Sequence, residues 1–530
     1  MKKHTMKKAL SLLLAAALLL PLVGCGEKQP AAEPDPVDDN YRTFYQIFVG
    51  SFSDDSGDGV GDLRGIINRF DYLNDGNVNS NTSLGVQGIW LSPIFSSPSY
   101  HKYDTTNYYK IDGKFGTEAD LKELVELCHS RNVKLILDLA INHTSGQHPW
   151  FVEFKQARRE GDTENPYYDY YTCVTAAEKV NGRTYQPIPG VDAWYECNFS
   201  GDMPELNFDN PAVRQEMLDV AKYYLDLGVD GFRFDAVKYI YYGDTQQNVA
   251  FWQWYMDELR AIKPDIYCVG ECWSGESEVL QYYPAMNCFN FAASQAEGVF
   301  ASTARIGGIS SFTNYIVSYQ KKVQQANPEG MMISFLSNHD MDRIAGSFLV
   351  EDYMRMAANL YLLAPGSPVI YYGEEIGMRG SRGSANTDAN RRLAMLWGDG
   401  DTVKDPSGST YDADKQIQAT VAQQKKEKDS LYRYYCRLLS IRHRYPAIAR
   451  GTYTAANCEK ELGGFLVQYE GERLVILHNT SMEKISFDLK NCAALADFEI
   501  AELAEIIGCG TASLDGTLLT IDGNTSVVIG

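Results

Sequence analysis

The chain is poor in positive charge. It contains 48 lysines and arginines against 69 aspartates and glutamates, and its formal net charge is −21. A surface with this excess of negative charge repels the phosphate backbone of nucleic acids as well as anionic lipid headgroups. We therefore expect no nucleic acid among the partners of this protein.

Cysteine motifs that bind metals are also missing, although the sequence has 11 cysteines. No two of them form a C-x-x-C pair, which excludes the commonest zinc and redox motifs. Cys128 falls on the apolar face of a predicted helix and Cys268 within an apolar strand. Both positions are typical of small buried hydrophobic residues. Export would permit disulfides, but the spacing gives no connectivity, so we assign none.

Long apolar runs are lacking as well, because the run from Ala9 to Leu20 is too short to span a membrane comfortably. Four lysines precede it and the tetrapeptide "LVGC", ending at Cys25, follows it. This order is typical of an export signal. It resembles a bacterial lipoprotein signal, in which the cysteine is lipidated, whereas an ordinary secretory peptide or a short membrane anchor is the alternative.

We therefore assign residues 1–25 to a lipoprotein signal peptide with lipidation at Cys25. Residues 26–40 are rich in proline and acidic residues, which predicts a disordered linker. The expected location is outside the cytoplasm, with a lipid anchor at the bacterial cell membrane or cell surface.

The rest of the chain has the composition of a globular protein, with 45% hydrophobic residues. From about residue 43 to residue 377, short β-rich runs alternate with amphipathic helical runs, which is typical of βα units. Eight strands are predicted, at 43–52, 86–94, 133–142, 231–237, 265–273, 288–291, 331–338 and 368–377. Eight such strands favour a closed (β/α)8 TIM barrel. A doubly wound open sheet is the alternative, but no glycine-rich phosphate turn follows the first strand.

Helix boundary signals support this pattern. One helix is predicted to begin after Thr117, because Asp120 three residues later completes a capping box. Another is predicted to begin at Asn210 and Pro211 and to end at Gly228.

Two segments depart from the βα pattern. Between the third strand and the helix at 211 lie too many residues for a plain connection, so we assign 144–206 to a small inserted domain within a barrel domain that spans 41–450. After about residue 450 the pattern becomes strand and turn only, which predicts an antiparallel β-sandwich domain at 451–530.

Polar residues end several of the predicted barrel strands, where barrels of this type place their active groups. In "GFRFDAV", Arg233 and Asp235 share one face of the strand and Phe232 and Phe234 the other. A guanidinium favours the charged form of a neighbouring carboxylate, which suits a nucleophile.

Each polar residue also has a structural interpretation: a buried ion pair for Arg233 and Asp235, and a turn or helix cap for Glu271 and for Asp340. Taken together, however, these three carboxylates with His143 and His339 are expected to meet in one pocket.

Seven segments resemble the motifs of the α-amylase superfamily of retaining glycoside hydrolases. "DLAINH", "GFRFDAVK", "VGECW" and "FLSNHD" match its four principal motifs, and "GDMPELNFDNP" is similar to its fifth. "GVQGIWLSPIF" and "PVIYYGEEIGM" resemble its further strand motifs. The resemblance covers most of residues 41–530.

The resemblance implies a role for each matching residue. Asp235 is implied as the nucleophile, Glu271 as the general acid and base, and Asp340 as the third carboxylate, which stabilises the transition state. The implied substrate-binding residues are Tyr103, His143, Arg233, Lys238, His339, Asp388 and Arg392. The last two lie in "DANRRLAMLW", where Ala394 replaces the proline that is common in the family.

The loop "SDDSGDGVGD" is a candidate calcium site. Asp54, Ser56, Asp58, the carbonyl of Val60 and Asp62 would supply only oxygen ligands, which hard cations prefer. A solvated acidic turn is the alternative. The family often has a similar loop that binds structural Ca2+, with asparagine where this chain has Ser56.

The resemblance implies an α-amylase that cleaves α-1,4-glucosidic bonds of starch, maltodextrins or malto-oligosaccharides. Ala236 and Lys238, which follow the nucleophile, resemble the α-1,4-specific pattern. An exo-acting α-glucosidase, a cyclomaltodextrinase or neopullulanase, and a non-catalytic glycan-binding surface lipoprotein are the alternatives. We expect a monomer.

Overall fold

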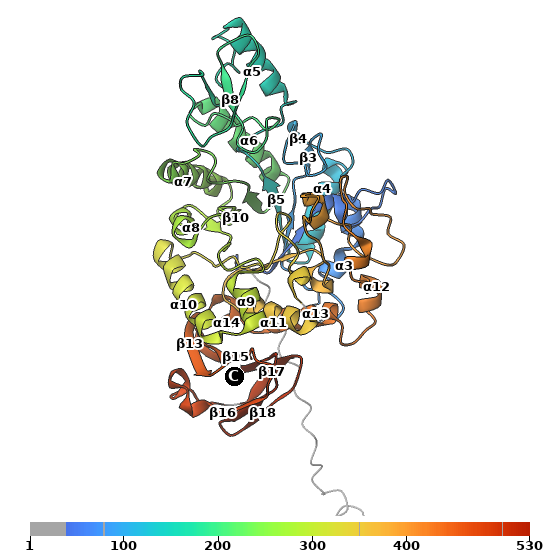
Figure 1. Cartoon of the computed structure of the whole chain (residues 1–530), viewed down its shortest axis with the longest axis vertical. Helices are drawn as coiled ribbons and strands as arrows, with labels where there is room; N and C mark the ends of the chain where they lie inside the picture. The colour runs from blue at the N-terminus through green and yellow to red at the C-terminus, as the bar shows by residue number, and fades with distance from the viewer. Residues whose placement is uncertain (1–38, 78–79, 349, 501) are drawn as a thin grey trace, which may run out of the picture. The chain divides into compact units, whose positions relative to one another are not determined.

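The structure is a computed structural model that describes residues 39–77, 80–348, 350–500 and 502–530 (Figure 1). The predicted signal peptide, Cys25 and nearly all of the predicted linker lie outside the described residues. The described residues all belong to one compact unit, Pro36–Gly530.

Seven parallel strands form the wall of a barrel. They are β1 (Phe44–Ile47), β2 (Gly88–Leu91), β5 (Lys134–Leu139), β9 (Gly231–Phe234), β10 (Tyr267–Gly270), β11 (Asn287–Cys288) and β12 (Val369–Tyr371). Their order in the sheet is β11-β10-β9-β5-β2-β1-β12. Apart from β12, which pairs with β1, the strands follow one another around the wall in chain order, as repeated βα units require.

The predicted strand at 331–338 closes the barrel, but it does so without a regular ladder. Phe289 and Ile333 form an isolated parallel bridge, and the N–H of Asn290 donates to the carbonyl of Ile333 at 2.9 Å. On the other side, the N–H of Val369 donates to the carbonyl of Ser334 at 2.8 Å. Because β11 ends at Cys288, little of it remains to pair with this segment. The closed barrel is therefore confirmed and the open sheet is excluded.

Helices cover the outside of the barrel: α2 (Leu63–Asn68), α3 (Phe70–Leu73), α4 (Glu118–Ser130), α6 (Pro211–Asp226), α7 (Thr245–Ile262), α8 (Glu276–Tyr282), α9 (Val299–Ile306), α10 (Ile309–Ala326), α11 (Glu351–Leu362), α12 (Val421–Gln424), α13 (Leu431–Arg444) and α14 (Pro446–Arg450). The predicted helix starts are confirmed. Thr117 and Asp120 form the capping box of α4, and Asn210 caps α6.

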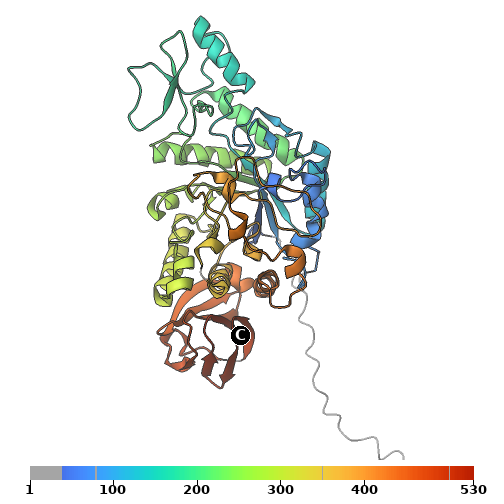
Figure 2. The same ribbon diagram turned by 45° about the vertical axis from the view of Figure 1, so that its right-hand side comes forward.

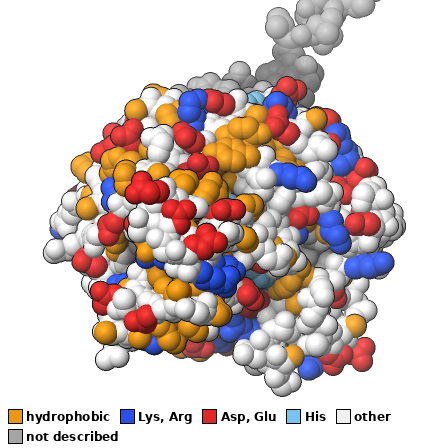
Figure 3. Space-filling view, turned by 90° about the horizontal axis from the view of Figure 1, so that it is seen from above, with side chains coloured by type: hydrophobic (Ala, Val, Ile, Leu, Met, Phe, Trp, Pro, Cys, Tyr) orange, Lys and Arg blue, Asp and Glu red, His pale blue; other side chains and the backbone are white. Residues whose placement is uncertain are grey.

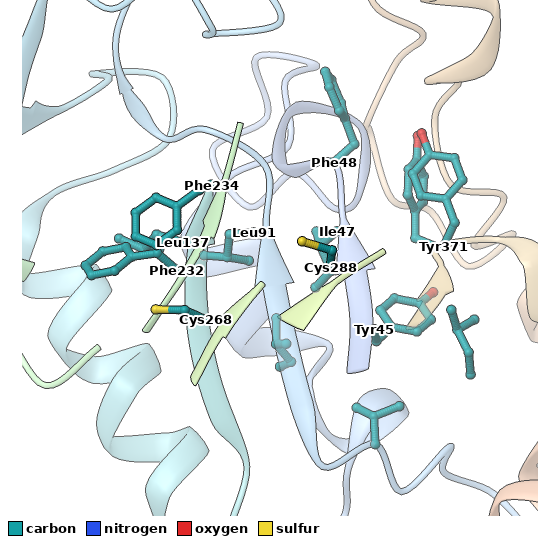
Figure 4. Close-up of a cluster of buried hydrophobic side chains, with 14 of the residues drawn as sticks. Tyr45, Ile47, Phe48, Leu91, Leu137, Phe232, Phe234, Cys268, Cys288 and Tyr371 are labelled. Atoms are coloured by element: carbon teal, nitrogen blue, oxygen red, sulfur yellow. The ribbon is translucent and has the colours of Figure 1, made fainter. Parts of the chain in front are cut away.

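The barrel strands bury both faces, as a parallel sheet between helices and a packed interior requires. Outward-facing side chains such as Ile47, Leu91 and Phe232 pack in the cluster that includes the helices (Figure 4). A second cluster fills the interior with Phe44, Trp90, Ile136, Tyr267, Val269, Phe289 and Ile333. The polar strand ends lie next to this interior cluster.

Residues 144–206 contain α5 (Pro149–Glu160) and a small antiparallel sheet of β6 (Cys173–Val174), β7 (Tyr185–Pro187) and β8 (Trp194–Glu196). A separate hairpin of β3 (Phe95–Ser96) and β4 (Asn107–Ile111) precedes this stretch. Arg183 links residues 144–206 to the barrel. Its guanidinium lies 3.1 Å from Glu196 of β8 and also donates to the carbonyl of Tyr242, which follows β9. Figures 1 and 2 show α5 at the opposite end of the barrel from the C-terminal sheets.

The C-terminal residues form two antiparallel sheets. One consists of β13 (Thr452–Glu459), β14 (Leu462–Tyr469), β15 (Glu472–Asn479), β20 (Thr525–Ile529) and β17 (Leu503–Gly508), and the other of β16 (Ile485–Asp488), β19 (Leu518–Ile521) and β18 (Ala512–Asp515). A separate hydrophobic cluster, with Val475 and Leu477 from one sheet and Leu519 and Ile521 from the other, joins them. This is the arrangement of a β-sandwich.

Acidic and basic side chains are interspersed on the face seen in Figure 3. In the described part of the chain, none of the helices combines the length and the apolar character that crossing a membrane would require.

Candidate active site

Arg233 holds three carboxylates together at the end of the barrel interior. Its Nη1 lies 2.8 Å from Asp138 Oδ1 and 2.6 Å from Asp235 Oδ1, and its Nη2 lies 3.1 Å from Glu271 Oε2. The arginine is only 1% exposed. Because one guanidinium contacts both, Asp235 and Glu271 are neighbours although they belong to different strands.

The backbone turns sharply directly after Asp235. Ala236 has a φ of 53°, in the left-handed region that a residue with a side chain seldom adopts. Its N–H donates to Glu271 Oε2 at 3.0 Å. Backbone strain of this kind is often found at functional sites, and here it links the end of β9 to the carboxylate that follows β10.

Burial raises the pKa of Glu271 to about 8. Arg233 opposes this shift, whereas the negative charges of Asp235 and Asp340 reinforce it. Glu271 therefore holds a proton at neutral pH, as a general acid must.

Asp340 is kept in its charged form. Burial alone would raise its pKa, but His339 and the guanidinium groups of Arg392 and Arg233 hold the pKa of Asp340 well below its usual range. Asp340 Oδ2 lies 2.8 Å from His339 Nε2, and Oδ1 lies 2.7 Å from Arg392 Nη2. The site thus combines a charged carboxylate with a protonated one.

Tyr103 and His143 complete the wall beside these carboxylates. The Tyr103 hydroxyl donates to Asp138 Oδ2 at 2.9 Å, and its ring is stacked on His339 at a 9° interplanar angle. His143 is 1% exposed, and its Nε2 has no hydrogen-bond partner in the described part of the chain. An unpaired buried ring nitrogen next to a cavity is suited to a ligand hydroxyl.

The remaining predicted substrate residues lie farther out. Asp388, in the short 3-10 helix Asp388–Arg391, pairs with Arg382 at 2.7 Å and Arg391 at 3.0 Å. Lys238 donates to the carbonyl of Trp273 at 2.8 Å. Lys238 therefore lies on the side of Glu271, and Asp388 on the side of Arg392 and Asp340.

A cavity of about 980 Å³ joins most of these groups. From the predicted set, its lining contains Tyr103, His143, Asp235, Glu271, Asp340, Asp388 and Arg392. Arg233, Lys238 and His339 do not line the cavity. Arg233 supports the lining from behind through Asp235 and Glu271, and His339 does so through Asp340.

Sequence reasoning missed two supporting residues. Asp138 is completely buried and accepts from Arg233, Tyr103 and Trp90. Gln46 contacts His339 Nδ1 at 2.7 Å. The alternation of side chains along β5 could have indicated that Asp138 points into the barrel, because Asp138 shares the inward face of this strand with Ile136.

The calcium expected in the loop at 53–62 stays a prediction. Both oxygens of Asp62 accept backbone N–H groups, from Gly65, Asp55 and Ser56, and Asp62 caps α2. Asp58 is exposed and accepts from the N–H of Val60. Among the described residues, no three acidic, histidine or cysteine side chains are grouped to hold a metal ion. A calcium ion in this loop would compete with these backbone N–H groups for the carboxylate oxygens.

Comparison with known proteins agrees with this geometry. The pattern of the family "Alpha amylase, catalytic domain" matches residues 46–451. The chain is 35% identical over 453 residues to Alpha-amylase 3 of Dictyoglomus thermophilum, covering 84% of this chain and 86% of that protein. It is 32% identical over 464 residues to a 4-alpha-glucanotransferase of Thermotoga neapolitana, covering 84% and 97%.

Among solved structures, Eubacterium rectale Amy13B superimposes with a TM-score of 0.85 at 32% identity, covering 94% of this chain and 99% of that one. The family pattern begins within β1 and includes every strand end described above. The chain therefore belongs to the alpha-amylase family and is a glycoside hydrolase.

Proposed function

We propose that the protein hydrolyses α-1,4-glucosidic bonds of starch, maltodextrins or malto-oligosaccharides with retention of configuration. The observation that carries this proposal is the contact of Arg233 with both Asp235 and Glu271. Retaining enzymes need a charged nucleophile and a protonated acid about 5 Å apart on either side of one bond. The names of the relatives support the α-glucan substrate.

In the first step, Asp235 attacks the anomeric carbon. Arg233 binds Oδ1, which leaves Oδ2 as the attacking atom. Glu271 gives its proton to the glycosidic oxygen, the bond between that oxygen and the anomeric carbon breaks, and the leaving chain departs as an alcohol. The charge of Asp340 stabilises the positive charge that develops on the sugar.

In the second step, Glu271, now ionised, takes a proton from water. The water oxygen attacks the anomeric carbon from the face that the leaving chain vacated, and Asp235 departs as a carboxylate. Two inversions give net retention. His143 Nε2, which has no hydrogen-bond partner among the described residues, can bind a hydroxyl of the same sugar in both steps.

Transfer to a sugar hydroxyl in place of water is the second candidate reaction, and the similarity to a glucanotransferase supports it.

We further propose Ca2+ at the loop 53–62, on the basis of its oxygen-only ligand set, and lipid anchoring at Cys25, on the basis of the sequence signal.

Replacing Asp235 by Asn tests the hydrolase proposal. The amide cannot act as the nucleophile, so we expect starch hydrolysis to fall by at least about 10³-fold with little change in melting temperature. Release of reducing ends from amylose and thermal melting measure the two quantities. Starch cleavage that persists unchanged would refute the mechanism.

A further inference from the structure

Two cysteine side chains meet in the C-terminal domain. Cys458 belongs to β13, and Cys492 lies between the 3-10 helices η6 (Leu489–Asn491) and η7 (Ala493–Leu495). Both are free thiols in the structure. Cys458 is half-buried, whereas Cys492 is only 1% exposed. Neither takes part in the reaction proposed above.

A β-bulge lies at Cys458. The register of β13 against β14 shifts between Asn457 and Glu459, so Cys458 has no opposing residue on β14. A bulge changes the direction of the side chain that it carries. Cys458 and Ala456 both pack with the hydrophobic cluster of the C-terminal domain, which includes Cys492. β13 therefore presents Cys458 to the segment that carries Cys492.

The two thiols are in direct contact. Cys492 Sγ lies 3.7 Å from the carbonyl oxygen of Asn457, the residue directly before Cys458. Cys458 Sγ lies 3.8 Å from the carbonyl oxygen of Ala456, and its S–H donates to the sulfur of Cys492. A disulfide needs cysteines whose Cα atoms lie within about 7 Å and whose side chains point toward each other. Thiols that hydrogen-bond to each other already point toward one another.

The surroundings of Cys492 favour its thiolate. The hydrogen bond from Cys458 lowers the pKa of Cys492 to about 7 against the opposing effect of burial, and the backbone N–H groups of Ala494 and Leu495 lower it further. The same hydrogen bond raises the pKa of Cys458. Because the thiolate is the form that attacks a disulfide, the pair holds one reactive sulfur at neutral pH.

The two cysteines lie on segments that are held very differently. The turn after β13 is docked on the barrel, next to α10 (Figure 1): Asn457 accepts from the hydroxyl of Thr313 at 2.6 Å, and Glu461 accepts from the N–H of Gly308 at 2.7 Å. In contrast, residues 489–500 have only η6 and η7 as regular structure. A covalent link at this point would join a weakly structured segment to a firmly held one.

We propose that Cys458 and Cys492 form a disulfide, by exchange with an external small-molecule disulfide such as oxidised glutathione, and that this bridge fastens residues 489–500 to β13. The inference is independent of the proposed reaction. The proposed export of the chain would bring it to a compartment where disulfides persist.

The exchange has two steps. Cys458, the more exposed thiol, passes its proton to Cys492 along their hydrogen bond, and its sulfur attacks one sulfur of the external disulfide while the other leaves as a thiolate. Cys492 then loses the proton to water and attacks the Cys458 sulfur, and the second external thiolate leaves. The two electrons of the new bond's thiols thus reduce the external disulfide to two thiols.

Peptide mapping tests whether the bridge forms. Purified protein is incubated with millimolar oxidised glutathione, its remaining thiols are alkylated, and it is digested with trypsin. Cys458 is the only cysteine of the tryptic peptide 451–460. Cys492 shares the peptide 491–530 with Cys509 alone. We expect the two peptides to be joined in the wild type and in Cys509→Ser, the matched control at an exposed cysteine, and to stay separate in Cys458→Ser.

Thermal melting tests whether the bridge fastens the segment. Closing residues 458–492 into a loop restricts the unfolded chain, so the oxidised wild type should melt about 3 °C or more above the same protein reduced with dithiothreitol. Cys509→Ser should keep this difference, and Cys458→Ser should lose it. Each variant is compared with itself, so any destabilisation by the substitution cancels. Equal melting temperatures of the oxidised and reduced wild type would overturn the fastening.

Three mapping results would overturn the bridge itself. Peptides that stay separate in the oxidised wild type would show that the thiols do not react with each other. A joined peptide that is lost in Cys509→Ser would assign the bridge to Cys509. Glutathione that remains on Cys458 as a mixed disulfide would show that Cys492 does not complete the exchange. Hydrolysis of maltotriose by the same samples reports on the proposed function separately, because neither Cys458 nor Cys492 lines the catalytic cavity.

Discussion

At the scale of single residues, the site depends on one arginine that serves several carboxylates. Arg233 contacts Asp138, Asp235 and Glu271 through two of its nitrogens. A lysine has one nitrogen and no planar fork, so it could not hold the three acids in the same arrangement. The arginine allows charged groups to be buried together while Glu271 stays protonated.

The raised pKa of Glu271 predicts how activity depends on pH. Because the general acid must be protonated, kcat/KM should fall as the pH rises through about 8 and then decline about tenfold per pH unit. A pH profile of maltotriose hydrolysis measures this limb. A limb that begins near pH 4 to 5, the usual range of a glutamate, would contradict the burial of Glu271.

Residue types and strand alternation predicted Asp235 and Arg233 on one inward face, because this signal is local. Gln46 carried no such signal. It belongs to β1, and its contact with His339 spans almost 300 residues, so only the closed barrel brings the two together.

At the scale of elements, the helix starts were predictable because capping is decided within four residues. Thr117 and Asp120 exchange hydrogen bonds directly, and they are only three residues apart in the chain. The predicted strand at 331–338 depended on partners far away in the chain. Its apolar residues do enter the barrel interior, but its pairing is limited by how short β11 is. The burial of this segment was therefore predictable from the sequence, whereas its backbone hydrogen-bond pairing was not.

The loop at 53–62 is the element whose calcium remains to be measured. If Ca2+ binds the folded loop, millimolar calcium should raise the melting temperature of the chelator-treated protein by about 2 to 4 °C, since a ligand that binds only the folded state stabilises it. Asp58→Asn should weaken this response, because it removes the negative charge of one expected ligand. An unmoved melting temperature would show that the hydrogen bonds of Asp54 and Asp62 are sufficient for the loop.

At the scale of the whole molecule, the proposed location depends on residues that the structure does not describe. If Cys25 is lipidated, Cys25→Ala should move the protein from the membrane fraction to the soluble fraction, since a lipid chain supplies most of the membrane affinity. Cell fractionation with immunoblotting measures this. Cys509→Ala, at an exposed cysteine of the C-terminal domain, should stay with the membrane. Equal distribution of both variants would exclude the anchor.

The barrel has a thin seam at residues 331–338, which join their neighbours through an isolated bridge between Phe289 and Ile333 on one side and through separate hydrogen bonds on the other. His339 and Asp340 follow that segment directly, so a fluctuation that parts the seam would carry them away from Asp235 without melting any helix. On heating, we expect catalytic activity to vanish some degrees before the far-ultraviolet circular dichroism signal, and deuterium to enter residues 331–338 before the neighbouring strands. Simultaneous loss of catalytic activity and of the circular dichroism signal would mean that the seam is as stable as the rest of the barrel wall.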